Sequence, residues 1–203
     1  RYVSRGGLKL EGALRQSGLS VAGKRCLDVG QSTGGFTDCL LQHGAASVVG
    51  VDVGHGQLHT ALRGDARVVC IEGVNARALK TTDFVAACID GQRAGATFDA
   101  DFEVIVGDLS FISLTLVLPA LVPLLAPQGA LLLLVKQQFE LQPGQVGKCG
   151  IVRDATLYTV VERRLREGLG SLDMRVAGWY DSAIMGGDGN REFFIHATHP
   201  TLT

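Results

Sequence analysis

The sequence predicts an α/β fold: a doubly wound, mostly parallel sheet of about seven strands with an antiparallel last strand. Two observations support this prediction. Short apolar runs alternate with stretches of helical periodicity, which is typical of parallel strands covered by helices on both faces. Four of the first five runs also carry a charged residue at or next to their end, namely Asp28, Asp52, Asp108 and Lys136. Ligands of such sheets bind at the carboxyl ends of the strands, so these four residues should converge.

The individual elements follow from this alternation. The predicted strands cover residues 25–29, 47–52, 67–72, 103–108, 130–136, 172–181 and 191–198. Helical periodicity occurs at about 8–17, 35–43, 56–63, 112–125 and 153–168. The last two strands are close in the sequence, so we expect them to form an antiparallel edge. The stretch 80–100 has weak periodicity and is assigned to no element.

The composition indicates one globular domain over residues 1–203, with 46% hydrophobic and 19% charged residues. A chain of this length buries about 70% of its unfolded surface without disulfides or metals. The low charge density excludes an intrinsically disordered chain. With 19 basic and 20 acidic residues the chain is not a polycation, so any contact with nucleic acid requires a local basic patch.

The cysteines indicate thiols in a reducing cytoplasm rather than a disulfide framework. There are five of them, none in a CxxC pair, and Cys26 and Cys70 lie in apolar, strand-like runs. The five histidines are scattered and no zinc-ligand spacing occurs, so we expect no metal site. The chain opens on a polar, basic stretch instead of a signal peptide, which also favours a cytoplasmic protein.

One long segment resembles a membrane span in its lack of charge. Residues 109–135 contain no charged side chain, but Pro119, Pro123 and Pro127 interrupt them. Prolines at this spacing break a spanning helix. We therefore expect a helix, a turn and a buried strand within a protein core, and no membrane partner.

A glycine-rich turn after the first predicted strand indicates a cofactor site, with the sequence Asp28-Val29-Gly30-Gln31-Ser32-Thr33-Gly34-Gly35-Phe36. Its GxxxGG pattern differs from the GxGxxG of dinucleotide folds. Asp28 suits the cationic S-adenosylmethionine better than the pyrophosphate of NAD. Asp52, at the end of the second strand, can hold the ribose diol of either cofactor. S-adenosylmethionine is favoured; an NAD-dependent oxidoreductase and a ligand-free turn are the alternatives.

Lys136 is the strongest candidate for catalysis. It follows a run of apolar residues at the end of a buried strand, where partial desolvation disfavours the charged ammonium. A lysine in such a place can accept a proton. Lys9, Asp108 and Glu192 are further candidates. For each of them a solvated charge or a surface ion pair is the simpler interpretation.

Several segments carry a family resemblance that covers essentially all of residues 2–197. They are Ser4–Leu10, Asp28–Asp38, Val51–Gly54, Asp108–Leu114, Val135–Lys136 with Gln138–Glu140, Gly150–Asp154 and Gly189–Phe193. In them the chain resembles the catalytic, FtsJ-like (RrmJ-like) domain of the TlyA family, which comprises ribosomal RNA ribose 2′-O-methyltransferases often described as hemolysins. Gln31, Gln137 and Ala183 depart from the residues expected there, a small residue and two prolines.

The resemblance implies a catalytic tetrad of Lys9, Asp108, Lys136 and Glu192. Lys136 would be the general base, with Lys9 lowering its pKa and Glu192 orienting it. Asp108 would either hold the methionine ammonium or position Lys136. Contacts with S-adenosylmethionine are expected from Asp28, Gly30, Ser32, Thr33, Gly34, Gly35, Phe36, Asp52, Val53, Asn75 and Asp108, with Asn75 at the adenine.

The resemblance also implies ribosomal RNA or ribosomal subunits as partners. Phosphate contacts are expected from Arg1, Arg5, Lys9, Arg15, Lys148, Arg153 and Arg191. The glycine-rich loop 143–150 is either a lid over the substrate or a plain connection. The family carries an N-terminal RNA-binding domain; this chain opens with Arg1, after the expected end of that domain, so we expect it to be absent here. A membrane-active hemolysin and a non-catalytic RNA-binding relative are the alternatives.

Overall fold

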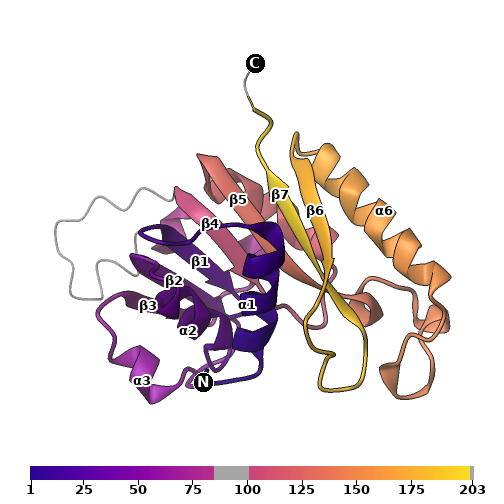
Figure 1. Cartoon of the computed structure of the whole chain (residues 1–203), viewed down its shortest axis with the longest axis horizontal. Helices are drawn as coiled ribbons and strands as arrows, with labels where there is room; N and C mark the ends of the chain where they lie inside the picture. Colours follow the sequence, from indigo (N-terminus) through magenta and orange to yellow (C-terminus); the bar gives the residue numbers. More distant parts are fainter. Residues whose placement is uncertain (85–100, 202–203) are drawn as a thin grey trace.

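The computed structural model describes residues 1–84 and 101–201 and has the predicted α/β fold (Figure 1). Seven strands form one sheet in the order β3-β2-β1-β4-β5-β7-β6. They are β1 (Arg25–Val29), β2 (Ser47–Asp52), β3 (Val68–Glu72), β4 (Phe102–Gly107), β5 (Leu125–Lys136), β6 (Arg175–Asp181) and β7 (Glu192–Thr198). Strand β7 pairs antiparallel with both β5 and β6, whereas the other pairs are parallel.

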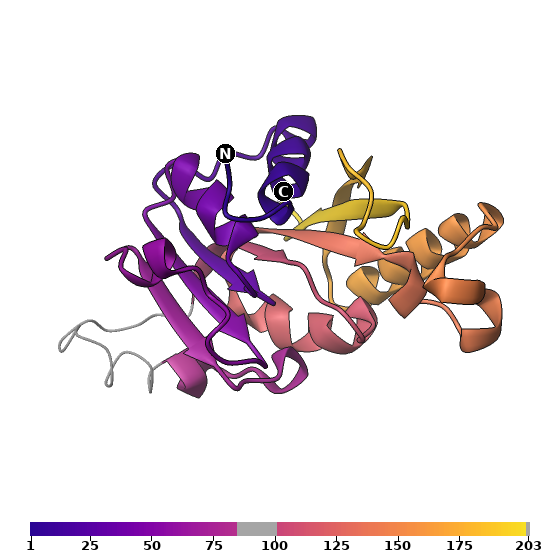
Figure 2. The same ribbon diagram turned by 90° about the horizontal axis from the view of Figure 1, so that it is seen from below.

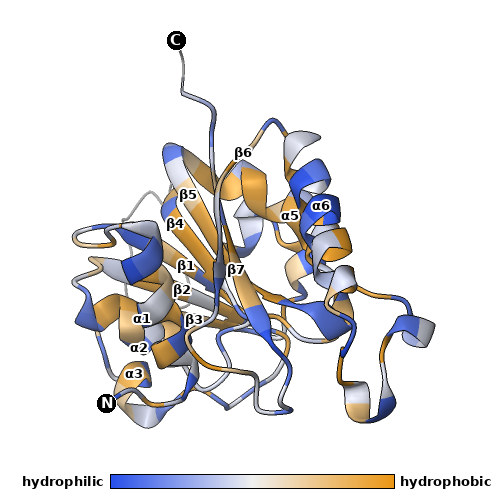
Figure 3. Ribbon diagram, turned by 45° about the vertical axis from the view of Figure 1, so that its right-hand side comes forward, coloured by the Kyte–Doolittle hydropathy of each residue, from blue (hydrophilic) through white to orange (hydrophobic). Residues whose placement is uncertain are grey.

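Helices cover both faces of the sheet (Figure 2). Helices α1 (Gly6–Ser17) and α2 (Gly35–Gln42) pack on one face, and α5 (Leu114–Leu121) and α6 (Thr156–Gly170) contribute to the core on the other. The shorter helices are α3 (Thr60–Arg63), η1 (Ala76–Ala78), η2 (Val122–Leu124), η3 (Gln137–Phe139), η4 (Pro143–Gln145) and η5 (Lys148–Gly150). The central strands are predominantly hydrophobic (Figure 3), because both of their faces are covered.

Two elements depart most from their predicted bounds. Helix α3 spans only Thr60–Arg63 rather than 56–63, because the side chain of His59 caps it by accepting from the amide of Ala61 at 3.2 Å. The fifth strand begins at Leu125 rather than at 130, because Leu125 pairs with Phe102. The pairing shifts register after this residue, and the exposed Pro127 is tolerated at that irregularity. The stretch 85–100, most of the segment without an assigned element, lies outside the described residues.

The uncharged segment 109–135 folds into α5, η2 and β5, as the prolines predict. Within residues 1–84 and 101–201, no helix has the length and apolar character that a membrane crossing requires. Of the two cysteines in apolar runs, Cys26 is buried and Cys70 is half-buried; the four described cysteines are free thiols, and Cys88 lies outside the described residues.

The charged ends of the strands converge at one end of the sheet. Strands β1, β2, β4 and β5 are linked by parallel pairing, so their carboxyl ends lie together. Strand β7 runs the other way, and its first residue, Glu192, lies opposite Lys136, the last residue of β5. The fold therefore places residues from both ends of the chain around one crevice.

Candidate active site

The four predicted catalytic residues form two ion pairs at this crevice. Lys9 Nζ lies 2.6 Å from Glu192 Oε2, and Lys136 Nζ lies 2.5 Å from Asp108 Oδ1. The first pair joins α1 to β7 and is buried, with side-chain exposures of 9% and 3%. The second pair is more open, with exposures of 15% for Lys136 and 27% for Asp108. Only the second pair is placed to meet a ligand.

The buried pair is electrostatically coupled to the open one. Burial raises the pKa of Glu192, while the hydrogen bond and charge of Lys9, and then the charge of Lys136, oppose that rise. A buried acid is tolerated here because a cation is held directly against it. Lys9 is therefore occupied inside the protein, and its burial does not fit the expectation that it also contacts RNA phosphates.

Ser110 is a site residue that sequence reasoning missed. Lys136 Nζ donates a hydrogen bond to Ser110 Oγ at 3.0 Å, besides its ion pair with Asp108. The amine is thus held from two sides by the loop that follows β4. The only signal for Ser110 was its place two residues after Asp108 in a segment that carries the family resemblance.

A cavity of about 440 Å³ opens beside this pair, within the range typical of small-molecule sites. A second hollow of about 180 Å³ adjoins it and is lined by Lys136. Both include Gly30, Ser32, Asp108 and Ser110 in their walls. The predicted cofactor residues that line one or both are Gly30, Ser32, Thr33, Gly35, Phe36, Asp52, Val53, Asn75 and Asp108. Lining residues that were not predicted include Gln31, Gln57, Leu109, Phe111 and Ile112.

The glycine turn brings the backbone close to the cavity floor. Gly30 has φ +78°, and a Cβ there would lie 2.4 Å from the carbonyl oxygen of Asp108. A side chain at this position would therefore push the turn away from the loop that carries Asp108. Gly34 faces away from both cavities, since its missing Cβ would meet Leu62 and Leu58 of the neighbouring segment.

Asp28 supports this turn from below instead of lining either cavity. Its Oδ2 accepts a hydrogen bond from Thr37 Oγ1 at 2.7 Å, and Thr37 Oγ1 in turn accepts one from Gln31 Nε2 at 2.9 Å. Asp28 is 1% exposed, and burial raises its pKa to about 7, with nearby Asp108 and Asp52 adding to the effect. Its predicted contact with the cofactor is therefore not a direct one across a cavity wall.

Asp52 and Asn75, two of the predicted cofactor residues, line the larger cavity. The carboxylate of Asp52 accepts from the amides of Ser32 at 2.6 Å and Gly54 at 2.8 Å, which fixes its orientation. Asn75 caps η1 by accepting from the amide of Arg77. A cavity with the carboxylates of Asp52 and Asp108 in its wall fits a ligand that combines ribose hydroxyls with positive charge.

Four of the predicted RNA-binding residues, Arg1, Arg5, Arg15 and Arg191, contact other groups of the protein. Arg5 donates to the carbonyl of Met185 at 3.0 Å, in the loop that precedes Glu192. Arg191 pairs with Asp181 at 2.7 Å, and Arg15 pairs with Glu11 at 3.3 Å, as does Arg1. Lys148 and Arg153 lie in and just after the glycine-rich loop 143–150. Lys9, as noted, is buried.

This sheet order is that of the class I S-adenosylmethionine-dependent methyltransferase fold. The fold is shared, for example, with a magnesium protoporphyrin IX methyltransferase from Synechocystis, at 13% identity, a TM-score of 0.61 and 97% and 82% coverage of the two chains. Within this class the chain belongs to the FtsJ-like methyltransferase family, which residues 2–199 match, and to its TlyA branch. This membership decides against the oxidoreductase alternative.

Closer relatives support the same assignment. The chain is 45% identical to the 16S/23S rRNA (cytidine-2′-O)-methyltransferase TlyA of Mycobacterium tuberculosis, over 96% of this chain and 67% of that protein. It is 41% identical to Hemolysin A of Brachyspira hyodysenteriae, over 97% and 76%. A crystal structure of a candidate hemolysin from Lactococcus lactis matches with a TM-score of 0.88 at 42% identity, over 98% of this chain and 89% of that one. The chain spans about two thirds of the length of its Bacillus subtilis and Mycobacterium tuberculosis relatives.

Proposed function

We propose that this chain transfers the methyl group of S-adenosylmethionine to a ribose 2′-hydroxyl of ribosomal RNA. The observation that carries the proposal is the amine of Lys136, held by Asp108 and Ser110 where the two cavities meet. An amine fixed at the edge of a cofactor cavity can receive a proton from a hydroxyl that enters beside it. The names of the Mycobacterium tuberculosis and Campylobacter jejuni relatives support RNA ribose as the acceptor.

The proposed chemistry divides simply between cofactor and protein. S-adenosylmethionine supplies an electrophilic methyl group on a sulfonium. The ion pair with Asp108 favours the ammonium form of Lys136, so Lys136 must first release that proton; it then accepts the proton of the attacking 2′-hydroxyl. Asp108 then stabilises the resulting ammonium through the contact already present at 2.5 Å. The buried pair of Lys9 and Glu192 holds α1 and β7 together beside the site. Positioning of the two reactants supplies much of the rate.

An exposed aromatic ring supports an unpaired nucleotide as the substrate. Phe111 lines the larger cavity and is 90% exposed, although burial is the usual fate of such a side chain. Its φ of +65° is uncommon for a residue other than glycine. The centroid of the Phe139 ring lies 5.1 Å from that of Phe111, and the two rings are tilted relative to one another. Proteins that bind unpaired RNA stack bases on rings presented in this way.

The remaining parts of the proposal concern the binding surface and its setting. We assign phosphate contacts to Arg5, Arg15, Lys148, Arg153 and Arg191, and we place the reaction in the cytoplasm, on ribosomal RNA or ribosomal subunits. Residues 1–203 would act as one methyltransferase domain. The glycine-rich loop 143–150 contributes Lys148 to this surface, and Arg153 follows three residues after the loop.

The test is a methylation assay with a chemical readout. The chain is incubated with isotopically labelled S-adenosylmethionine and either naked ribosomal RNA or isolated subunits, and the digested nucleosides are separated by mass spectrometry. Label in a 2′-O-methyl nucleoside is the expected result. Calorimetric titration with S-adenosylmethionine, with NAD as control, tests the cofactor separately. Label confined to a base, or saturable binding of NAD alone, would contradict the proposal.

A further inference from the structure

Glu140 is a buried acid that the proposed chemistry does not use. It lies at the end of η3, four residues after Lys136, and is 5% exposed. Its Oε1 accepts from the amide of Leu114 at 2.8 Å, and its Oε2 accepts from Ser113 Oγ at 2.5 Å. Ser113 and Leu114 are the N-cap and first residue of α5, so Glu140 caps a helix that belongs to a different part of the chain.

The backbone around Glu140 is itself held firmly. Its carbonyl accepts from Arg164 Nη1 of α6 at 2.6 Å, and its amide donates to the carbonyl of Gln137 at 3.0 Å. One residue earlier, Phe139 contacts the ring of Phe111. The short segment after Lys136 is therefore a fixed support, because it is tied to α6 on one side and to the loop 108–113 on the other.

The loop 108–113 is fixed at both of its ends, and the two groups that contact Lys136 lie between these ends. Their positions therefore depend on the support at each end. At the first end the amide of Asp108 bonds to the carbonyl of Val29 at 3.1 Å. At the other end the contacts of Ser113 are with Glu140 and with Thr115. Between these ends lie the carboxylate and hydroxyl that hold Lys136 Nζ. The left-handed backbone at Phe111, which L-residues seldom adopt, needs such a restraint.

We propose that Glu140 is a positioning residue for methyl transfer: it sets the place of Asp108 and Ser110 around Lys136 by clamping the far end of their loop. This inference rests on the proposed role of Lys136. Burial raises the pKa of Glu140, and its two donors satisfy both oxygens. Removing the side chain would release the loop while leaving every residue that contacts substrate in the chain.

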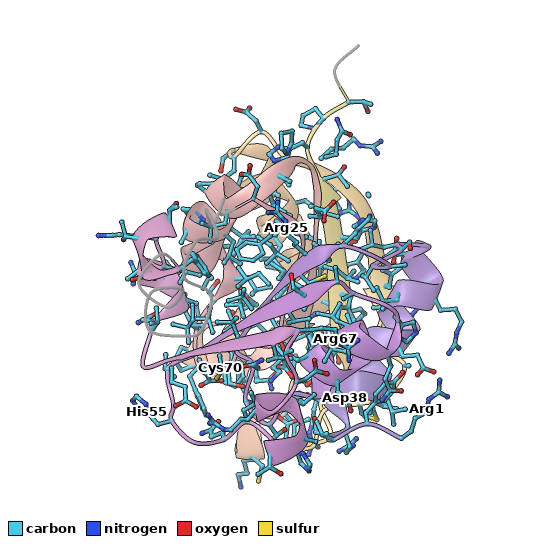
Figure 4. The ribbon with its side chains drawn as sticks, turned by 90° about the vertical axis from the view of Figure 1, so that its left-hand side faces the viewer. Arg1, Arg25, Asp38, His55, Arg67 and Cys70 are labelled. Atoms are coloured by element: carbon cyan, nitrogen blue, oxygen red, sulfur yellow. The ribbon has the colours of Figure 1, made fainter. Side chains whose placement is uncertain are left out.

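Three variants and one control test the inference on the whole chain. Glu140→Ala removes both bonds, Ser113→Ala removes one, and Glu140→Gln keeps an acceptor for Leu114. Asp65→Ala is the matched control: its carboxylate also accepts a backbone amide, that of Arg67 at 2.9 Å, but at the opposite end of the sheet. Figure 4 shows Arg67 towards one end of the edge strand β3 and His55 towards the other end, which is the end of the sheet that carries the site.

The first readout is independent of RNA: the rate at which acetic anhydride labels the amine of Lys136, followed by mass spectrometry with the amine of Lys24, just before β1 at the far end of the sheet, as internal reference. We expect Glu140→Ala to label Lys136 about threefold faster or more, Ser113→Ala to do so to a smaller degree, and Glu140→Gln and Asp65→Ala to stay near the wild-type rate. The second readout is kcat per folded molecule, well below the unfolding temperature, for which we expect a loss of about tenfold or more in Glu140→Ala and recovery in Glu140→Gln.

A purely structural role would lower the unfolding temperature of Glu140→Ala without changing either readout, and that result would overturn the inference. So would faster labelling of Lys136 with a wild-type kcat. If Glu140→Ala does not fold, Ser113→Ala decides by the same two measurements. Absence of methyl transfer in the wild type would contradict the proposed function instead, and the labelling experiment would still decide whether Glu140 holds Lys136 in place.

Discussion

The two lysines of the tetrad differ in their surroundings, and this difference assigns their roles. Lys9 is buried against Glu192, with a separation of 2.6 Å, so its amine is committed to the protein. Lys136 is held by an open carboxylate and a hydroxyl at the cavity edge. Only Lys136 can approach a bound hydroxyl without breaking a buried ion pair, which costs several kcal/mol when one partner is removed.

The first prediction concerns that amine. Lys136→Ala should reduce methyl transfer by about a hundredfold or more, because a positioned proton acceptor typically contributes that much. The dissociation constant for S-adenosylmethionine should change by less than about threefold, since Lys136 lines the smaller hollow and not the larger cavity. Initial rates with labelled cofactor and calorimetric titration measure the two effects. A variant that retains nearly the wild-type rate would refute the assignment of the base.

A second prediction concerns the exposed ring at the cavity mouth. Phe111→Ala should raise KM for RNA by about tenfold, because loss of base stacking typically costs 1–3 kcal/mol, roughly that ratio. Stability should change little, since the ring is 90% exposed. Leu116→Ala on α5 is the control, because it truncates another exposed apolar side chain that does not line the cavity. Equal KM values for the two variants would argue against stacking.

At the scale of elements, the sheet was predictable because each strand reads as a separate apolar run, for example Val104–Val106 and Leu131–Leu134. The convergence of Asp52, Asp108 and Lys136 followed from strand ends alone. The start of β5 at Leu125 did not, since it depends on pairing with Phe102, which no local pattern encodes. Tertiary pairing outweighed the turn signal of the proline and glycine that follow Leu125.

The site was predictable where residues have chemistry that stands out in the sequence, and less so elsewhere. Lys9 and Glu192 are 183 positions apart, and only the family resemblance placed them in one tetrad; the ion pair between them was not predicted. Ser110 and Phe111 act through position, because a loop conformation presents them to the cavity. Asp28 was expected at the cofactor but lies beneath the turn, because its side chain faces Thr37 within the protein.

Gly30 lies where the glycine turn comes closest to the backbone of Asp108. Gly30→Ala should weaken S-adenosylmethionine binding by about tenfold or more and destabilise the fold by about 1–3 kcal/mol, because its Cβ would meet the carbonyl of Asp108. Gly18→Ala is matched in backbone, with φ +69°, but has no neighbour within 4 Å. It should lose stability without losing cofactor affinity. Calorimetry and urea unfolding measure both quantities; equal effects on binding would contradict the role of the close approach.

At the scale of the whole molecule, buried acids make stability depend on pH in an unusual direction. Burial raises the pKa of Asp28 to about 7, so the native state keeps a proton that the unfolded chain releases near pH 4. Unfolding therefore releases a proton between these values, and the free energy of unfolding falls as pH rises from about 4 to about 7. Burial raises the pKa of Glu140 and of Glu192 in the same sense.

Asp28→Asn tests this linkage because asparagine keeps the shape and an acceptor for Thr37 but does not titrate. The difference in free energy of unfolding between the variant and the wild type should grow in favour of the variant from pH 5 to pH 8, by at most about 3 kcal/mol. The reason is that only the wild type must ionise a buried acid over this range. Urea unfolding of both proteins at the two pH values measures the difference. A difference that does not change with pH would show that Asp28 is already ionised in the native protein at pH 5.

Net charge gives the last prediction, because a protein of formal net charge -1 cannot attract RNA by its overall charge. Binding must come from the few assigned arginines and lysines, so the affinity for a ribosomal RNA fragment should fall with salt, and each contact to single-stranded RNA should add about 0.7 to the slope of log K against log salt. Arg153→Ala and Lys148→Ala should each flatten that slope by this amount. Arg67→Ala should not, because Arg67 pairs with Asp65 at the far end of the sheet. Fluorescence anisotropy between about 50 and 200 mM salt measures the slopes. An equal change in the Arg67 variant would mean that RNA is held by diffuse charge and not by the surface around the site.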